Sequence, residues 1–348
     1  MTAPQIRVSI VGVSGFAGAE LARLLEADGR FSLVAAVGDR WKGEALGARV
    51  RLDGPSARLA VASMPEALEA AASAEIALLA TPADASARLA PAILARGVRV
   101  VDLSGAFRLL DPADYPRWYG FDHPAPELLA EARYGLPELP AAAGAAPSAR
   151  DARLVANPGC YATATILALA PLLAARAVDP LGLFADGKSG VTGAGRKLED
   201  RLLFNEVADN LSPYRVARHQ HAPEIEQALA RVAGSEVRLT FVPHLVPIRR
   251  GLLVTAFGRL LPGAGDLDRT LRLAYEGAEE VEVSAVEDVS IASVVHTARA
   301  RVGATSDPTR GAAVAVGALD NLLKGAASQA MQNLCAMVGL PYRAQATP

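Results

Sequence analysis

A short apolar stretch, a glycine-rich turn and a helix open the chain, and together they constrain its fold more than any other feature. Residues 6–11 read IRVSIV, residues 12–18 read GVSGFAG, and a helix is expected over residues 19–27. Glycines let the backbone turn tightly and approach a pyrophosphate, which the helix N-terminus then holds. The spacing is G-x-x-G-x-x-G and not the commoner G-x-G-x-x-G, so a purely structural turn is the alternative.

Strands and helices continue to alternate after this motif. Strands are expected over residues 32–37, 76–80 and 98–103, with a helix over 84–96 and another beginning at the capping-box sequence SMPE of residues 63–66. This alternation predicts a mostly parallel sheet whose strand carboxyl ends line a ligand crevice. The candidate cofactor contacts there are Thr81, Pro82, Ser104 and Gly105, each of which is otherwise an ordinary turn residue.

The end of the second strand distinguishes between cofactors. Asp39 alone suggests NAD, because an acid there binds the ribose hydroxyls. Arg40 and Lys42 offer cations for a 2′-phosphate, which favours NADP. A solvated charged turn is the alternative.

Composition excludes several classes of partner. The chain has 348 residues, 51% of them apolar, and a net charge of −2, which gives no electrostatic reason to expect nucleic acid or an anionic membrane. The longest apolar stretch is too short to span a bilayer, and no signal peptide is expected. The two cysteines and the absence of metal-ligand spacing indicate a soluble cytoplasmic protein without a metal.

The candidate nucleophile is Cys160. It follows an apolar strand and Asn157-Pro158-Gly159, at the first turn of a helix expected over residues 161–173. Unpaired backbone N–H groups and the positive end of the helix dipole favour the thiolate there. The alternative is a small buried residue that packs the helix start.

Two further segments carry polar groups. Residues 187–197, GKSGVTGAGRK, combine glycines, hydroxyls and cations in what is expected to be an anion-binding or simply flexible loop after a strand over 181–186. His219 and His221 precede a helix expected to start with Pro223 at its first position, and one of them could act as acid or base. His244, His296 and Cys335 are interpreted as structural.

The C-terminal half predicts a mixed open sheet. Strands are expected over residues 236–242, 251–258, 281–286, 299–303 and 312–316, with helices over 267–275 and 319–337. An Ala/Gly/Pro-rich linker over 141–148 suggests a boundary between residues 1–150 and 151–317. Attack by a cysteine on an activated acyl group, followed by reduction with a nicotinamide, unites these features.

Seven stretches in order carry a resemblance that covers nearly the whole chain: GVSGFAGAEL, VDLSGAFRL, YGLPE, ANPGCYATA, KSGVTGAGRK, HQHAPEI and DNLLKGAASQAMQN. With them the chain resembles the N-acetyl-γ-glutamyl-phosphate reductase family of arginine synthesis, within the aspartate-semialdehyde dehydrogenase-like superfamily. The resemblance implies a Rossmann-type NADP-binding domain, completed by the C-terminal helix of residues 318–348. It also implies an α+β, glyceraldehyde-3-phosphate dehydrogenase-like catalytic and dimerisation domain and a homodimer or homotetramer.

The resemblance also implies roles for individual residues. Cys160 would displace phosphate from the acyl group, and His219 or His221 would protonate the oxygen, with His219 slightly favoured. The cofactor phosphates would be held by Gly12, Ser14, Gly15, Phe16, Ala17 and Gly18, and the nicotinamide approached by Asn321. The substrate site would contain Ser189, Gly190, Arg196 and Arg218.

Departures from the family pattern and rival interpretations are few. Ala106 replaces a usual acid, and Ala298 an expected asparagine, which leaves the late cofactor loop unassigned. A lysine-pathway homologue acting on a carrier-bound aminoadipyl phosphate is the nearest rival, but Asn157-Pro158 and the Gly-Ala-Gly-Arg sequence argue against it. Aspartate-semialdehyde dehydrogenase lacks the His-x-His-x-Pro-Glu-Ile run, and a lapsed NADP-binding module would have lost the cysteine or the histidines.

Overall fold

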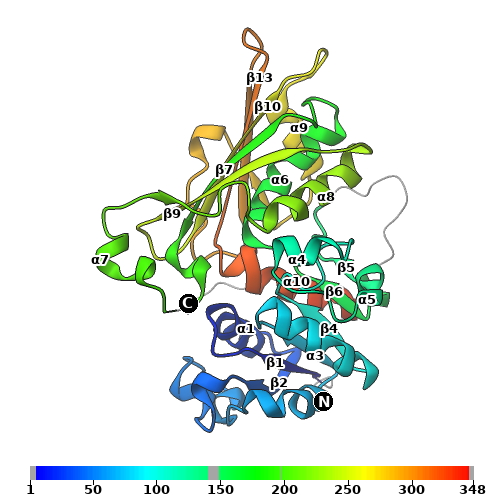
Figure 1. The fold of residues 1–348 in the computed structure, drawn as a ribbon, viewed down its shortest axis with the longest axis vertical. Helices are drawn as coiled ribbons and strands as arrows, with labels where there is room; N and C mark the ends of the chain where they lie inside the picture. The colour runs from blue at the N-terminus through cyan, green and yellow to red at the C-terminus, as the bar shows by residue number, and fades with distance from the viewer. Residues whose placement is uncertain (1–4, 140–148, 197, 345–348) are drawn as a thin grey trace. The chain divides into compact units, whose positions relative to one another are not determined.

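The computed structural model describes residues 5–139, 149–196 and 198–344. The chain forms two compact units, each built around one sheet (Figure 1). The first unit comprises Met1–Gly135, Pro147–Pro158 and Ala326–Pro348, and the second Leu136–Ala146 and Gly159–Gly325. The linker expected over 141–148 lies outside the described residues.

The first unit contains a six-stranded parallel sheet in the order β2-β1-β3-β4-β6-β5. Its strands are β1 (Ile6–Val11), β2 (Phe31–Val37), β3 (Ile76–Leu79), β4 (Arg99–Asp102), β5 (Arg133–Tyr134) and β6 (Leu154–Ala156). Its helices are α1 (Phe16–Ala27), α2 (Ala67–Ala72), α3 (Ala83–Ala95), α4 (Asp114–Trp118), α5 (Glu127–Glu131) and α10 (Ser328–Val338).

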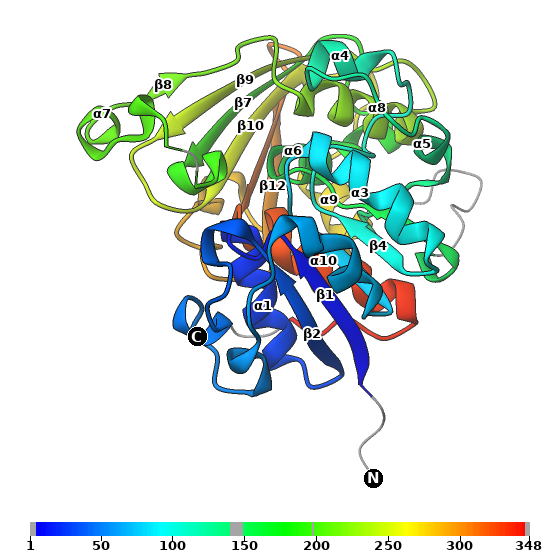
Figure 2. The same cartoon turned by 60° about the horizontal axis from the view of Figure 1, so that its bottom comes forward.

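Apolar side chains on both faces of this sheet hold the helices. In β3, Ala77 and Leu79 join the core cluster formed with α2 and α3, while the alternate residues Ile76 and Leu78 are equally buried. Helices α1 and α10 pack against each other, and Figure 2 shows α1 beside β1 and β2. The capping box expected at Ser63 is present, since Glu66 accepts from both the Ser63 backbone N–H and its hydroxyl.

The second unit contains a seven-stranded mixed sheet in the order β11-β12-β13-β10-β7-β9-β8. Its strands are β7 (Leu183–Gly190), β8 (Ser212–Pro213), β9 (Leu239–Val246), β10 (Leu252–Arg259), β11 (Val281–Val283), β12 (Ala300–Asp307) and β13 (Ala312–Leu319). Its helices are α6 (Cys160–Ala174), α7 (Phe204–Val207), α8 (His221–Ala233) and α9 (Leu267–Ala274). The two-part α/β fold expected from the sequence, with one parallel and one mixed sheet, is therefore confirmed.

Helix α6 is the centre of the second unit. Every residue from Tyr161 to Leu173 is buried, as expected for a helix that is apolar on all sides. It packs on β10 and β13 and is flanked by α8 and α9 (Figure 1). Phe184 of β7 and Phe257 of β10 are paired across the sheet and remain 56% and 45% exposed.

Several expectations about the second unit are wrong in detail; among them, the strands expected over 281–286, 299–303 and 312–316 run over Val281–Val283, Ala300–Asp307 and Ala312–Leu319. Gly187–Gly190 belong to β7 and not to a loop, because both neighbouring strands pair with them; only residues 191–194 turn, as a 3₁₀-helix. Helix α8 starts at His221, so Pro223 is its third residue and not its first. Strand β9 runs on to Val246, beyond the expected end at residue 242.

The closing helix also begins later than expected. Leu319 ends β13, and a π-helical turn at Leu323–Ala327 precedes α10. The Asp320 carboxylate accepts from the backbone N–H groups of Leu322 and Leu323, which satisfies these donors in the turn after the strand. Within the ranges described, no helix has both the length and the apolar character needed to cross a membrane.

Candidate active site

The glycine turn of the first unit depends on close backbone contacts. Gly12 has a φ of 99°, and a Cβ there would lie 2.4 Å from the Ala80 carbonyl oxygen. A Cβ on Gly18 would lie 2.3 Å from the Gly12 carbonyl oxygen, so the first turn of α1 can rest on the loop only without a side chain. The N-terminal N–H groups of α1 are thereby held at the end of β1, as a bound anion requires.

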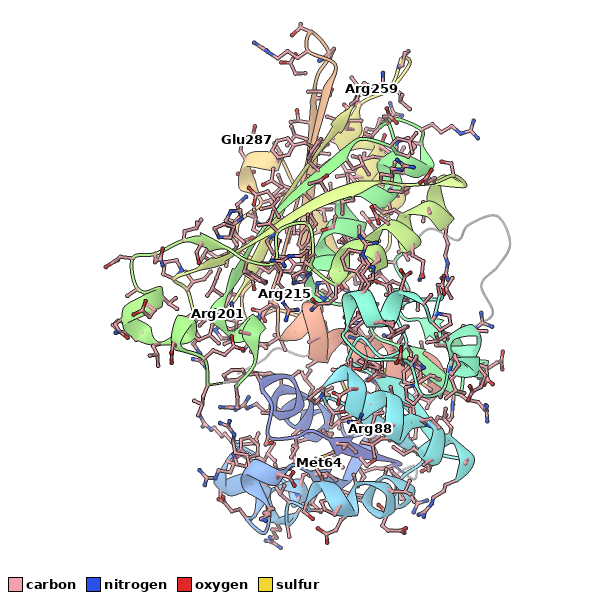
Figure 3. The ribbon with its side chains drawn as sticks, in the orientation of Figure 1. Met64, Arg88, Arg201, Arg215, Arg259 and Glu287 are labelled. Carbon is pink, nitrogen blue, oxygen red and sulfur yellow. The ribbon has the colours of Figure 1, made fainter. Side chains whose placement is uncertain are left out.

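The end of β2 lies directly beside this turn. A Cβ on Gly38 would meet the Ser14 hydroxyl at 2.8 Å. Asp39 and Arg40 follow in a 3₁₀-helix (Asp39–Trp41), and the Asp39 carboxylate accepts from the backbone N–H of Met64 at 2.7 Å. That carboxylate oxygen therefore holds the neighbouring loop, whose Met64 is labelled in Figure 3.

Polar residues also follow β3 and β4. The Thr81 hydroxyl lies 2.8 Å from that of Ser86, and Pro82 is the N-cap residue of α3. Ser104 donates from its hydroxyl to the Asp102 carboxylate at 2.8 Å, and burial raises the pKa of Asp102. A Cβ on Gly105 would lie 2.1 Å from the Tyr119 ring, which fixes this turn.

The first unit thus brings the expected cofactor residues together. They follow the carboxyl ends of the neighbouring strands β2, β1, β3 and β4, which lie at one edge of a parallel sheet. Asn321 is in the second unit instead. It is 3% exposed, accepts from the Gly251 backbone N–H at 2.8 Å and donates to the Thr192 hydroxyl at 3.0 Å.

Cys160 is the first residue of α6, with Gly159 as its N-cap. The Gly159 N–H donates to the buried Glu224 carboxylate at 2.8 Å, so α8 holds the start of α6. A Cβ on Gly325 would lie 2.6 Å from the Cβ of Cys160. Close contact on one side and a fixed N-cap on the other restrict where the thiol can be.

Both histidines pack against the residue after the cysteine. The Tyr161 ring meets those of His219 and His221 edge-on, at centroid distances of 5.7 and 6.1 Å. His219 Nδ1 accepts from the His221 backbone N–H at 3.2 Å, which leaves the ring proton on Nε2. Burial, then His221 and Arg215, lower the pKa of His219 to about 2, so this imidazole is neutral and its Nε2–H is the group that can donate a hydrogen bond.

A pocket of about 230 Å³ opens beside these rings. Its lining includes Ser189, Gly190, Arg201, Tyr214, Arg215 and His219. Burial raises the pKa of Tyr214 to about 12, and Cys160 adds to the shift, which places the cysteine within electrostatic reach of the pocket wall. Arg201 pairs with Glu199 at 2.7 Å and Arg215 donates to Gln220 at 2.7 Å; Figure 3 labels both arginines in the same part of this unit.

The expected substrate residues divide into two groups. Ser189 and Gly190 line the pocket, whereas Arg196 and the exposed Arg218 are not among its lining residues. The sequence did not single out Tyr214, Arg201 or Glu224. Their signal is weak because a single arginine, tyrosine or glutamate has no motif spacing that would identify it. No group of acidic, histidine and cysteine side chains in the described part of the chain could hold a metal ion.

Two family models match these units. Residues 7–145 match the semialdehyde dehydrogenase NAD-binding domain, and residues 160–321 the semialdehyde dehydrogenase dimerisation domain. Among solved structures, aspartate semialdehyde dehydrogenase II from Vibrio cholerae has a TM-score of 0.74 at 18% identity, covering 97% of this chain and 99% of that one. A probable aspartate-semialdehyde dehydrogenase from Pseudomonas aeruginosa has a TM-score of 0.70 at 20% identity, over 97% and 100% of the two chains. These likenesses concern the fold.

Relatives in sequence are more specific. The N-acetyl-gamma-glutamyl-phosphate reductase of Laribacter hongkongensis is 43% identical over 97% of this chain and 96% of its own. That of Syntrophobacter fumaroxidans is 40% identical over the same shares. The chain therefore belongs to the N-acetyl-gamma-glutamyl-phosphate reductase family of the semialdehyde dehydrogenases.

Proposed function

We propose that this protein reduces N-acetyl-γ-glutamyl phosphate with NADPH to N-acetylglutamate 5-semialdehyde and phosphate, as a step of arginine synthesis. The observation that carries the proposal is Cys160 at the start of α6, next to a tyrosine whose ring packs on two histidines, one of which lines a pocket with two arginines. A nucleophile, a proton donor and anion-binding groups are the requirements of acyl transfer from an acyl phosphate.

The residues of the second unit support each part of the acyl-transfer step. The Cys160 sulfur attacks the acyl carbon, the C–O bond to phosphate breaks, and a thioester and inorganic phosphate result. Arg201 and Arg215 offer charge-assisted hydrogen bonds to the phosphate or carboxylate of the substrate. His219, neutral and protonated at Nε2, donates a hydrogen bond to the oxygen on which negative charge develops. We therefore assign the donor role to His219, with His221 fixing its tautomer through the backbone.

NADP fits the first unit better than NAD. The close backbone contacts at Gly12 and Gly18 hold the first N–H groups of α1 at the end of β1, where a pyrophosphate would bind, and the Asp39 carboxylate is engaged with the Met64 backbone N–H. Arg40, beside it, supplies a cation for a 2′-phosphate. When bound, the cofactor supplies the hydride that reduces the thioester. Arg40→Ala should lower the affinity for NADP about ten-fold and leave that for NAD within two-fold, as titration of cofactor fluorescence would measure.

The partner proposed for the second unit is a further copy of this chain, in a homodimer or homotetramer. The match to a dimerisation domain and the exposed pair Phe184 and Phe257 support the mixed sheet as the contact surface. Two cysteines that form no disulfide, one of them the proposed nucleophile, suit a reducing compartment such as the cytoplasm. Sedimentation of the native protein beside Phe257→Lys would test the surface: an unchanged oligomer in the variant would reject it.

The activity test runs the reaction in reverse. Purified protein should reduce NADP with N-acetylglutamate semialdehyde only when phosphate is present, and Cys160→Ala should not. Activity retained in Cys160→Ala would exclude the thioester. A native protein that binds NADP but does not react would instead direct attention to a carrier-bound aminoadipyl substrate.

A further inference from the structure

The chain passes between the two units at three described positions that are distant in sequence. The described crossings are Gly135 to Leu136, Pro158 to Gly159, and Gly325 to Ala326. The last residues on the first-unit side of these crossings are Gly135, Pro158 and Ala326. One buried cluster of amide side chains within the first unit ties all three together.

Asn333 of α10 is the centre of this cluster. Its Nδ2 donates to the Gly135 carbonyl and to Oδ1 of Asn157, both at 2.9 Å, while Gln329 donates to the same Gly135 carbonyl at 3.1 Å. The side chain of Asn333 is 1% exposed, and its Oδ1 accepts no hydrogen bond among the described residues. Asn333 therefore holds the cluster together through the hydrogen bonds that its amide nitrogen donates.

Asn157 is held at each of its polar groups. Its backbone N–H donates to the Asp102 carbonyl at 2.8 Å, and its carbonyl accepts from Arg108 Nε at 2.8 Å. Its Nδ2 lies 3.4 Å from the carbonyl oxygens of Pro158 and Ala326. The second and third crossings are therefore linked through Asn157, and the first through Asn333.

Only a short, stiff piece of chain separates this cluster from the nucleophile. Between Asn157 and Cys160 stand Pro158, whose ring fixes φ, and Gly159, whose N–H is bound by Glu224. A displacement of Asn157 is therefore passed on to the start of α6 and cannot be absorbed by a flexible linker.

We propose that Asn333 is a positioning residue: through Asn157 and Gly135 it fixes where the Cys160-bearing segment leaves the cofactor-binding unit. The inference rests on the proposed function, in which the thioester on Cys160 must be presented to a cofactor held by the other unit. Acylation needs only groups of the second unit, whereas reduction also needs the cofactor, which the first unit is proposed to hold. Loss of the Asn333 amide should therefore slow reduction and spare acylation.

The test compares the two steps in Asn333→Leu, which keeps the shape of the side chain and removes the donor. The first measurement is the burst of inorganic phosphate released from N-acetyl-γ-glutamyl phosphate without cofactor, and the second is single-turnover oxidation of NADPH. We expect the burst rate to stay within about two-fold and the reduction rate to fall about 10- to 100-fold, as for a misplaced reacting group. Gly135→Ala should act alike, because its Cβ would lie 2.3 Å from Asn333 Nδ2.

Ser328→Ala is the matched control, since Ser328 is equally buried on α10 and its hydroxyl has no hydrogen-bond partner among the described residues. It should change neither rate. Equal slowing of both steps in Asn333→Leu, or of neither, would overturn the positioning role. A native protein without a phosphate burst would contradict the proposed substrate instead. In that case the rate of Cys160 alkylation still tests the positioning role. Bound NADP should alter this rate in the native protein and alter it less in Asn333→Leu. An equal effect of NADP in both proteins would overturn the inference.

Discussion

The nucleotide-binding edge of the first unit and the pocket of the second differ in how they are built. At the edge, Gly18 packs on the Gly12 backbone within one turn, and the other expected cofactor residues follow the ends of neighbouring strands. In the pocket, His219 takes its environment from Tyr161 of α6, Phe241 of β9 and Tyr214 beside β8. The first arrangement is local and repeated; the second exists only after a mixed sheet has formed.

The largest expected effect is that of a substitution at Cys160, which should abolish the chemistry of the second unit without affecting cofactor binding by the first. Cys160→Ser should lower activity roughly 10⁴-fold, because the hydroxyl is a far weaker nucleophile at neutral pH. NADP affinity should stay unchanged, since the glycine turn and Arg40, which are proposed to hold the cofactor phosphates, belong to the first unit. Steady-state kinetics and a binding titration on the same preparation measure both, and a parallel loss of NADP binding would show that the regions are not independent.

A substitution in the glycine turn should do the opposite: it should weaken cofactor binding and leave the reactivity of Cys160 unchanged. Gly18→Ala places a Cβ 2.3 Å from the Gly12 backbone oxygen, so the turn must shift and NADP affinity should fall about 100-fold. Gly29→Ala is the control, because nothing lies within 4 Å of a Cβ there. Alkylation of Cys160 should proceed normally in both variants. If Gly18→Ala bound NADP as tightly as the native protein, the turn would not be the phosphate site.

The buried histidine gives the second unit a pH dependence that the glycine turn lacks. The pKa of His219 is about 2 in the folded protein, against an ordinary value of 6.5. Between these values the unfolded chain binds more protons, so stability falls as the pH drops below about 6.5. At pH 5 this costs about 2 kcal/mol.

His219→Asn should remove that part of the dependence. The difference in unfolding free energy between pH 7 and pH 5, from urea titrations, should shrink by about 2 kcal/mol relative to the native protein. An identical difference in the two proteins would mean that His219 is not held neutral.

A smaller effect sharpens the assignment of the pocket. Arg215→Ala should raise KM for the acyl substrate about ten-fold through a lost charge-assisted hydrogen bond, with KM for NADP unchanged. The exposed Arg218, which the sequence favours, gives the contrast, and Arg218→Ala should leave both constants within two-fold. The opposite ranking of the two variants would restore the sequence-based assignment and remove Arg215 from the site.

The sequence predicted most strands and helices because their signals are local. The apolar run of residues 6–11, the capping box at Ser63 and the helix start at Cys160 each appear in the structure where the pattern indicated. Expectations failed where pairing partners decided the outcome. Gly187 to Gly190 have a loop-like composition, yet they pair with strands on both sides, and the Tyr161 ring occupies the space where a side chain at Gly187 would be.

The sequence by itself determined the fold class, the family, the glycine turn and the position of the proposed nucleophile Cys160, because each depends on residues that are close together in the chain. Only the tertiary structure showed that Nδ1 of His219 is occupied by a backbone N–H, which arginines face the pocket, and that Asn333 joins three crossings of the chain. These depend on distances between segments that no local pattern encodes. The tautomer of His219, the lining of the pocket and the Gly135 carbonyl that Gln329 and Asn333 share all depend on which residues are neighbours in space.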